Sequence, residues 1–138
     1  MEGNDLDDGT SIVKRPYSLC CNFMPHKLAN RKCLPCNGET PPVPVAERAG
    51  LLTELRGWAI EDGVLTRTVT LPDFVSAVDL ATRITPLAEL EGHHPDLHVS
   101  YGKLRIDLIT HAIHDLSEND FILAAKLSLL IDRPPARR

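Results

Sequence analysis

Two adjacent histidines, His93 and His94, stand immediately before Pro95, and a third histidine, His111, follows further along the chain. Imidazole both gives and takes a proton near neutral pH, because its reference pKa is about 6.5. Three imidazoles in one place therefore suit general acid and base chemistry. They suit zinc equally well, because catalytic zinc sites commonly have three protein ligands and a water molecule. The spacing of the histidines does not separate a proton-transfer site from a zinc site.

The elements around these histidines are expected to bring them to one cleft. Apolar residues recur every three or four positions between Asp73 and Ala88, which predicts a helix that Asp73 caps and that ends before the paired histidines. Pro86 lies inside this pattern and predicts a kink or a break. Alternating apolar residues over 97–109 predict a strand pair after the histidines. His111 follows this pair, so we expect the three histidines to share one cleft.

Three further elements complete the expected fold. A short amphipathic helix over 45–55 comes first. An Asp-Gly turn before the alternating segment 64–71 predicts a second strand pair. Ser117, with Asp120 as its capping-box partner, starts the last helix. The order of elements predicts an α+β fold. Two ββα units are expected to form a two-layer domain, with a four-stranded antiparallel sheet in one layer and the helices on one face of it. The short helix precedes these two units in the chain.

The chain of 138 residues is long enough for a single hydrophobic core. Residues 1–43 mix Gly, Pro and polar residues without a period, so we expect an N-terminal extension that is partly disordered. Residues 44–132 are expected to form the domain. Residues 133–138, which include two prolines, are expected to be a frayed C-terminal tail.

All four cysteines, Cys20, Cys21, Cys33 and Cys36, precede the segments with clear periodicity. They are therefore not expected to form disulfide bonds that stabilise the core, and we assume that the thiols are reduced. Cys33 and Cys36 form one CxxC motif, so a four-thiolate zinc site with Cys20 and Cys21 is conceivable. A lone CxxC is weak evidence, and we favour a protein without metal.

Charge and hydropathy exclude two classes of protein. The formal net charge of -4 provides no broad basic field, which disfavours direct binding of nucleic acid. No apolar run approaches the roughly 20 residues of a membrane span. The first eight residues are acidic, the wrong charge for a targeting peptide, so we expect a cytoplasmic protein without membrane partners.

The spacing of Glu89, His93-His94-Pro95, Tyr101, His111 and Asp120 resembles the signature of the pterin-4a-carbinolamine dehydratase family. Flanking segments resemble the family as well, from about Lys32 to Lys126: Lys32-Cys33-Leu34-Pro35-Cys36, Pro41-Pro42, Gly57-Trp58, Pro72-Asp73-Phe74 and Leu116 to Phe121, with Ala124-Ala125-Lys126. The spacing from the His-His-Pro motif to His111 is the most specific part.

The resemblance implies a hydro-lyase that converts 4a-hydroxytetrahydrobiopterin, or a related 4a-hydroxytetrahydropterin, to the quinonoid dihydropterin and water in pterin recycling. It implies no metal and no cofactor. The resemblance implies that His93 and His111 are the general acid and the general base, and it does not say which of them is which. His94 is counted with them as catalytic, and its main role is to hold the substrate. The residues expected to bind the substrate are Gly92 and Thr110, through their backbone, and His94, Pro95 and Glu89.

Several residues depart from the pattern or have a plainer explanation. Leu97 stands where some members of the family carry tryptophan, so an aromatic wall for the pterin is missing or supplied elsewhere. The turn pair His114-Asp115 replaces small residues and glycine, which adds charge at the rim and costs backbone freedom. Asp120 is expected mainly to cap the last helix. Tyr101 is expected in the core.

Two alternatives to the enzyme come from the same resemblance: an assembly chaperone of the Rubisco and carboxysome type, and a dimerisation cofactor without catalysis. Neither needs the three histidines, whose retention favours the enzyme. The resemblance also implies a homodimer or homotetramer, with association to Rubisco or to an aromatic amino-acid hydroxylase as further partners to consider. The apolar segment 127–131 is richer than one helix stripe requires, which hints at association.

Overall fold

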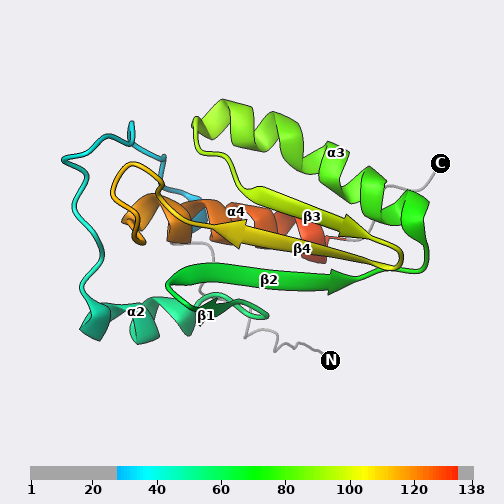
Figure 1. The fold of residues 1–138 in the computed structure, drawn as a ribbon, viewed down its shortest axis with the longest axis horizontal. Coiled ribbons are helices and arrows are strands. Elements are labelled where there is room, and N and C mark those ends of the chain that lie inside the picture. Colours follow the sequence, from blue (N-terminus) through cyan, green and yellow to red (C-terminus); the bar gives the residue numbers. More distant parts are fainter. Residues whose placement is uncertain (1–27, 134–138) are drawn as a thin grey trace, which may run out of the picture.

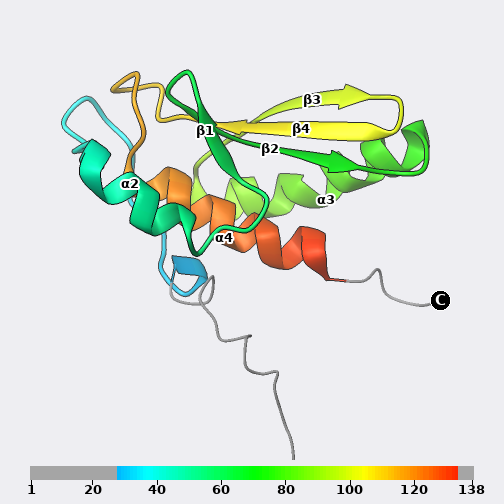
Figure 2. The same cartoon turned by 90° about the horizontal axis from the view of Figure 1, so that it is seen from below.

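The computed structural model of the protein describes residues 28–133. Its elements are α2 (Val45–Leu52), β1 (Ala59–Glu61), β2 (Val64–Thr70), α3 (Phe74–Glu91), β3 (Asp96–Ser100), β4 (Lys103–Leu108) and α4 (Glu118–Asp132). The strands form one antiparallel sheet in the order β1-β2-β4-β3 (Figure 1). Figure 2 shows the three helices on one side of this sheet, so the predicted α+β fold is confirmed. Within residues 28–133, no helix is long and apolar enough to cross a membrane.

The turn between β1 and β2 follows from its two residues. Asp62 and Gly63 both have positive φ angles, of 52° and 79°. A two-residue hairpin of this kind matches the twist of the strands, and Asp-Gly is one of its preferred sequences. The pairing of Glu61 with Val64 closes the hairpin and confirms the predicted strand pair.

Helix α3 begins where the sequence predicted but continues further. The side chain of Asp73 accepts a hydrogen bond from the Ser76 amide at 2.8 Å, which caps the helix. The helix then runs through Pro86 to Glu91, so the break allowed for at Pro86 does not occur. Pro86 lies on the exposed face, where water can satisfy the carbonyl group that its missing N–H leaves free.

The core lies between the inner face of the sheet and helices α3 and α4. Leu65, Leu104, Ile106 and Leu108 are completely buried on the strands. They pack in one cluster with Ile84 of α3 and, from α4, Phe121 and Leu123. Helix α4 begins with the predicted capping box between Ser117 and Asp120. This cluster fixes the middle of α3 and the start of α4 relative to β4.

Tyr101 is not part of this core. It occupies the turn between β3 and β4, where 76% of it is exposed. The expectation of a core tyrosine was wrong, because alternation predicted an inward direction for a residue that belongs to the turn rather than to the strand.

The segment before α2 contributes to the core. Leu28, Cys33 and Val43 are buried in the same cluster. The amide of Val43 donates to the Leu116 carbonyl oxygen at 2.9 Å, which ties this segment to the loop before α4. Packing therefore begins before residue 44, where the domain was expected to start.

The apolar end of α4 packs within the chain. Leu127 is completely buried, and Leu130 and Ile131 are partly buried against the core. The excess of apolar residues in segment 127–131 is explained by this packing, so it carries no argument for association.

Candidate active site

The side chains of the two adjacent histidines engage different partners. The His93 ring is turned inward, with only 7% of its side chain exposed, whereas 61% of the His94 side chain is exposed. The left-handed conformation of Gly92, with φ 66°, ends α3 just before them. Pro95 then favours the extended backbone at His94, and successive side chains along such a segment point in opposite directions.

A buried carboxylate holds the His93 ring. Nε2 of His93 lies 2.7 Å from Oδ1 of Asp120, which is completely buried. The other carboxylate oxygen accepts from the Thr110 hydroxyl at 2.7 Å and from the Ser117 amide at 2.9 Å. Asp120 thus accepts hydrogen bonds on both oxygens. Its capping role is confirmed, and its bond to His93 was missed because sequence spacing does not reveal contacts between separate elements.

The second nitrogen of His93 meets the CxxC motif. Sγ of Cys36 lies 3.5 Å from Nδ1. Because Asp120 accepts at Nε2, the neutral ring carries its proton there, and Nδ1 accepts from the thiol. Both nitrogens of His93 are therefore bound within the protein.

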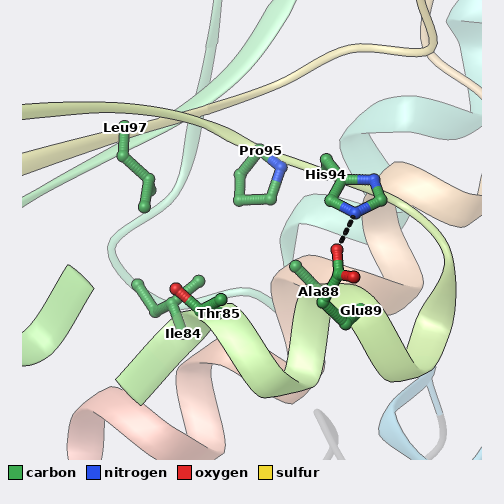
Figure 3. Close-up of a pocket in the computed structure, with 7 residues that line it drawn as sticks. All are labelled: Ile84, Thr85, Ala88, Glu89, His94, Pro95 and Leu97. Atoms are coloured by element: carbon green, nitrogen blue, oxygen red, sulfur yellow. Dashed lines mark hydrogen bonds and ion pairs between the residues drawn. The ribbon is translucent and has the colours of Figure 1, made fainter. Parts of the chain in front are cut away.

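His94 lines a cavity beside helix α3 (Figure 3). Nε2 of His94 lies 2.5 Å from Oε1 of Glu89, which belongs to the last turn of α3. The cavity has a volume of about 120 Å³, and its lining residues are Ile84, Thr85, Ala88, Glu89, His94, Pro95 and Leu97. Figure 3 shows Pro95 and Leu97 facing the helix from the strand side. The cavity joins an apolar wall to an imidazole and a carboxylate.

His111 lies in the turn after β4, and its side chain is close to Asp96 at the start of β3. Its Nε2 is 3.6 Å from Oδ2 of Asp96, the residue that directly follows Pro95, and both side chains are largely exposed. Neither His111 nor His93 is among the described residues that line the cavity at His94. The structure therefore places the three histidines around one short segment but not in one cavity.

The backbone amides at Gly92 and Thr110 already have partners. Gly92 donates to the Glu89 carbonyl oxygen at 3.3 Å, within the C-terminal cap of α3. Thr110 donates to the Asp115 carbonyl oxygen at 3.0 Å. A backbone contact from either residue to a substrate would therefore use a carbonyl oxygen, and that of Thr110 already accepts from the Ile113 amide at 3.1 Å.

The turn after β4 is stabilised despite its unusual residues. His114 has a φ of 53°, a conformation that glycine adopts at lower cost. Asp115 accepts from the Leu116 amide at 2.7 Å and pairs with Arg48 at 2.9 Å. These contacts hold the pKa of the Asp115 carboxyl below its ordinary value, the amide bond contributing most. Neither turn residue belongs to the lining of the cavity at His94.

Among residues 28–133, no group of three or more His, Cys, Asp and Glu side chains is arranged to hold a metal ion. Within this range the three histidines do not form the zinc site that their residue types allow. Cys20 and Cys21 lie outside the described residues, so the four-thiolate site is not tested.

Comparisons with known proteins agree on one family. The model of the family described as "Pterin 4 alpha carbinolamine dehydratase" matches residues 41–130. A Rickettsia bellii protein named "Putative pterin-4-alpha-carbinolamine dehydratase" is 45% identical over 105 residues, which is 75% of this chain and 93% of that protein. A protein of the same name from Nitrosomonas eutropha is 40% identical over 105 residues, with the same coverage.

A solved structure is similar as well. It is described as a transcriptional coactivator/pterin dehydratase from Brucella melitensis, and its TM-score to this chain is 0.62 at 26% sequence identity. The similarity covers 66% of this chain and 99% of that chain.

Proposed function

The chain belongs to the pterin-4a-carbinolamine dehydratase family of hydro-lyases, and we propose that it removes water from a 4a-hydroxytetrahydropterin such as 4a-hydroxytetrahydrobiopterin. The observation that supports this most is the cavity at His94, where an imidazole paired with Glu89 adjoins an apolar wall. A pterin offers a flat ring to such a wall and ionisable groups to its polar edge. Pockets for small molecules commonly combine these two features.

The reaction needs two proton transfers and no change of oxidation state. The 4a-hydroxyl group takes a proton, the bond between C4a and that oxygen breaks, and water leaves. N5 loses a proton, which yields the quinonoid dihydropterin. A positioned acid and a positioned base would each accelerate such steps by roughly 10²- to 10⁴-fold.

The geometry favours a division of roles that differs from the expected one. His94 faces the cavity and has one nitrogen held by Glu89, so it is suited to touch the substrate and to move a proton. His111 is exposed beside Asp96 and is suited to act from the other side of Pro95. Both ring nitrogens of His93 are bound within the protein, so His93 is suited to position the adjacent His94.

The remaining binding residues follow from the same cavity. Glu89 and Pro95 line it, and we assign them to binding with His94. Gly92 and Thr110 adjoin the histidines, and their amides are already bonded, so only their carbonyl oxygens are assigned a contact. Leu97 lies in the wall where some relatives carry an aromatic residue.

A stopped-flow assay tests the proposal. The protein is mixed with a freshly generated 4a-hydroxytetrahydropterin, and formation of the quinonoid dihydropterin is followed against the uncatalysed reaction. We expect a rate that rises in proportion to protein concentration. Folded protein, verified by circular dichroism, that leaves the rate unchanged would reject the assignment.

We also propose that the protein self-associates into a dimer or tetramer in the cytoplasm. Apolar side chains of Phe74, Val75 and Val78 are exposed at the start of α3. Exposed apolar clusters often mark interfaces, and Cys33 and Cys36 are free thiols, which fits a reducing compartment. Light scattering of wild type and Val75→Glu tests association, and an unchanged monomeric mass for both would reject it.

A binding role without catalysis is the second candidate function, because the Brucella relative is described as a coactivator as well as a dehydratase. The stopped-flow assay decides between the two candidates, since a pure binding module leaves the dehydration rate unchanged.

A further inference from the structure

We propose that Cys36 is a nucleophilic thiol, activated by the His93 and Asp120 pair, that hydrogen peroxide oxidises to a sulfenic acid. The proposal concerns a side chain outside the cavity at His94. It rests on the geometry of three ionisable groups and on a second thiol, and it does not depend on the dehydratase activity.

The first observation is the order of the three groups. Sγ of Cys36 lies 3.5 Å from Nδ1 of His93, and Nε2 of the same ring lies 2.7 Å from the buried Asp120 carboxylate. The carboxylate fixes the ring so that its unprotonated nitrogen faces the thiol. The carbonyl oxygen of Leu34 is a more distant acceptor, at 3.9 Å from Sγ. A thiol, an imidazole and an orienting carboxylate in this order activate cysteine nucleophiles in general.

The second observation is a donor aimed at the sulfur. Nδ2 of Asn119 donates to Sγ of Cys36 at 2.9 Å. The same side chain holds the motif in place, because Oδ1 accepts from the Leu34 amide at 2.9 Å. The thiolate is the nucleophilic form of cysteine, and a donor beside the sulfur offers its negative charge a hydrogen bond. Asn119 therefore positions Cys36 and stabilises the charge that develops as its proton leaves.

The third observation is the contrast between the two thiols of the motif. Cys33 is buried, and its amide donates to Oε1 of Glu91 at 3.0 Å. Burial, together with the Glu91 charge, raises the pKa of the Cys33 thiol to about 12. Cys36 is partly exposed. Peroxide-sensitive cysteines are typically accessible and have a second cysteine nearby, so Cys36 is the thiol that reacts.

The step balances without a further reagent. His93 takes the thiol proton, the sulfur attacks one peroxide oxygen, and the bond between the two oxygens breaks. The departing oxygen takes up that proton and leaves as water. Sulfur is oxidised by two electrons and the peroxide is reduced by two. The sulfenic acid can then condense with the Cys33 thiol, which forms a disulfide and releases a second water.

Peptide mass spectrometry of the full chain tests the proposal, because it reports each cysteine separately. Reduced protein and glutathione are treated with iodoacetamide near neutral pH, and in parallel with hydrogen peroxide plus a dione that traps sulfenic acid. We expect Cys36 to be alkylated about tenfold or more faster than Cys33 and than glutathione. We also expect peroxide to produce the trapped acid at Cys36 or a disulfide between Cys33 and Cys36.

The matched variants are His93→Gln and His98→Gln. His93→Gln should slow alkylation of Cys36 to the rate of glutathione, whereas His98→Gln, which changes an exposed histidine on β3, should leave it unchanged. Alkylation of wild-type Cys36 at or below the rate of glutathione overturns the proposal, and this measurement needs no variant. Equal rates in wild type and folded His93→Gln, or no oxidation product at Cys36, overturn it as well.

Discussion

The carboxylate of Asp120 holds the ring of His93 from within the core, with 2.7 Å between Oδ1 and Nε2. The same carboxylate caps helix α4 through the Ser117 amide. The start of α4 and the end of α3 are therefore joined through one buried side chain. This connection places the His-His-Pro segment against the sheet.

Replacing Asp120 with Asn is expected to destabilise the protein by about 2 kcal/mol. The variant keeps the size of the side chain, but its amide group offers one acceptor oxygen where three donors converge, so a buried donor is left unpaired. The free energy of unfolding in urea measures the loss. The control Asp79→Asn, on the exposed face of α3, should change it by less than about 0.5 kcal/mol. Equal stability of the two variants would contradict the role of Asp120.

Much of the fold could be predicted from the sequence, because its signals are local. The Asp-Gly turn specified the hairpin between β1 and β2, and Asp73 and Ser117 marked the starts of α3 and α4. Of the kink or break predicted at Pro86, the break does not occur. Whether a proline breaks a helix depends in part on the burial of the carbonyl group that loses its hydrogen bond. That burial is a property of the folded chain.

The site was less predictable than the fold. Spacing indicated that His93, His94 and His111 would meet, and it gave no direction for their rings. The direction of His93 depends on Asp120 and Cys36, which come from α4 and from the segment before α2. The CxxC motif was the available signal for that segment, but its position before the periodic elements suggested an extension outside the core.

Stability should depend on pH through Glu91. Burial alone would raise the pKa of its carboxyl, but hydrogen bonds from the Cys33 amide and the Lys126 ammonium, at 3.0 Å and 2.5 Å, outweigh burial and lower the pKa below 4.5, its ordinary value. A lowered pKa in the folded state means that the unfolded chain takes up this proton first as pH falls. The contribution is therefore complete above the ordinary value and is lost as pH falls through the lowered one.

The variant Glu91→Gln isolates this effect. At neutral pH we expect its free energy of unfolding to be about 1 to 3 kcal/mol lower than that of wild type, because the Lys126 ammonium loses its charged partner. This difference in the free energy of unfolding should shrink as the pH falls below the ordinary pKa of the carboxyl group. Urea titrations over a series of pH values check this, with Glu47→Gln on α2 as the control. A difference that stays constant with pH would refute the assignment.

Replacing Leu97 with Trp should tighten substrate binding. Leu97 lines the cavity opposite Ile84, and an indole there would give the pterin ring an aromatic face. Aromatic pairs contribute about 1 kcal/mol beyond burial, which predicts a severalfold lower KM. The control Leu90→Trp, at an exposed position of α3, should leave KM unchanged. A KM that rises for Leu97→Trp would show that the indole fills the cavity instead of lining it.

The three histidines should differ in how their loss affects turnover. His94→Ala removes the imidazole that faces the cavity, so kcat/KM should fall by about 10²-fold or more with little change in stability. His111→Ala should lower kcat by a similar factor, because it removes the second proposed proton-transfer group. Its stability should change little, since the exposed ring makes one distant ion pair. His93→Ala should lower both stability and turnover, because it leaves Asp120 and the Cys36 thiol without their partner. Stopped-flow rates combined with urea unfolding separate these outcomes, and His98→Ala serves as the exposed control. If His93→Ala abolished turnover at wild-type stability while His94→Ala kept full kcat, the proton-transfer role would belong to His93 and the division of roles proposed from the cavity would be rejected.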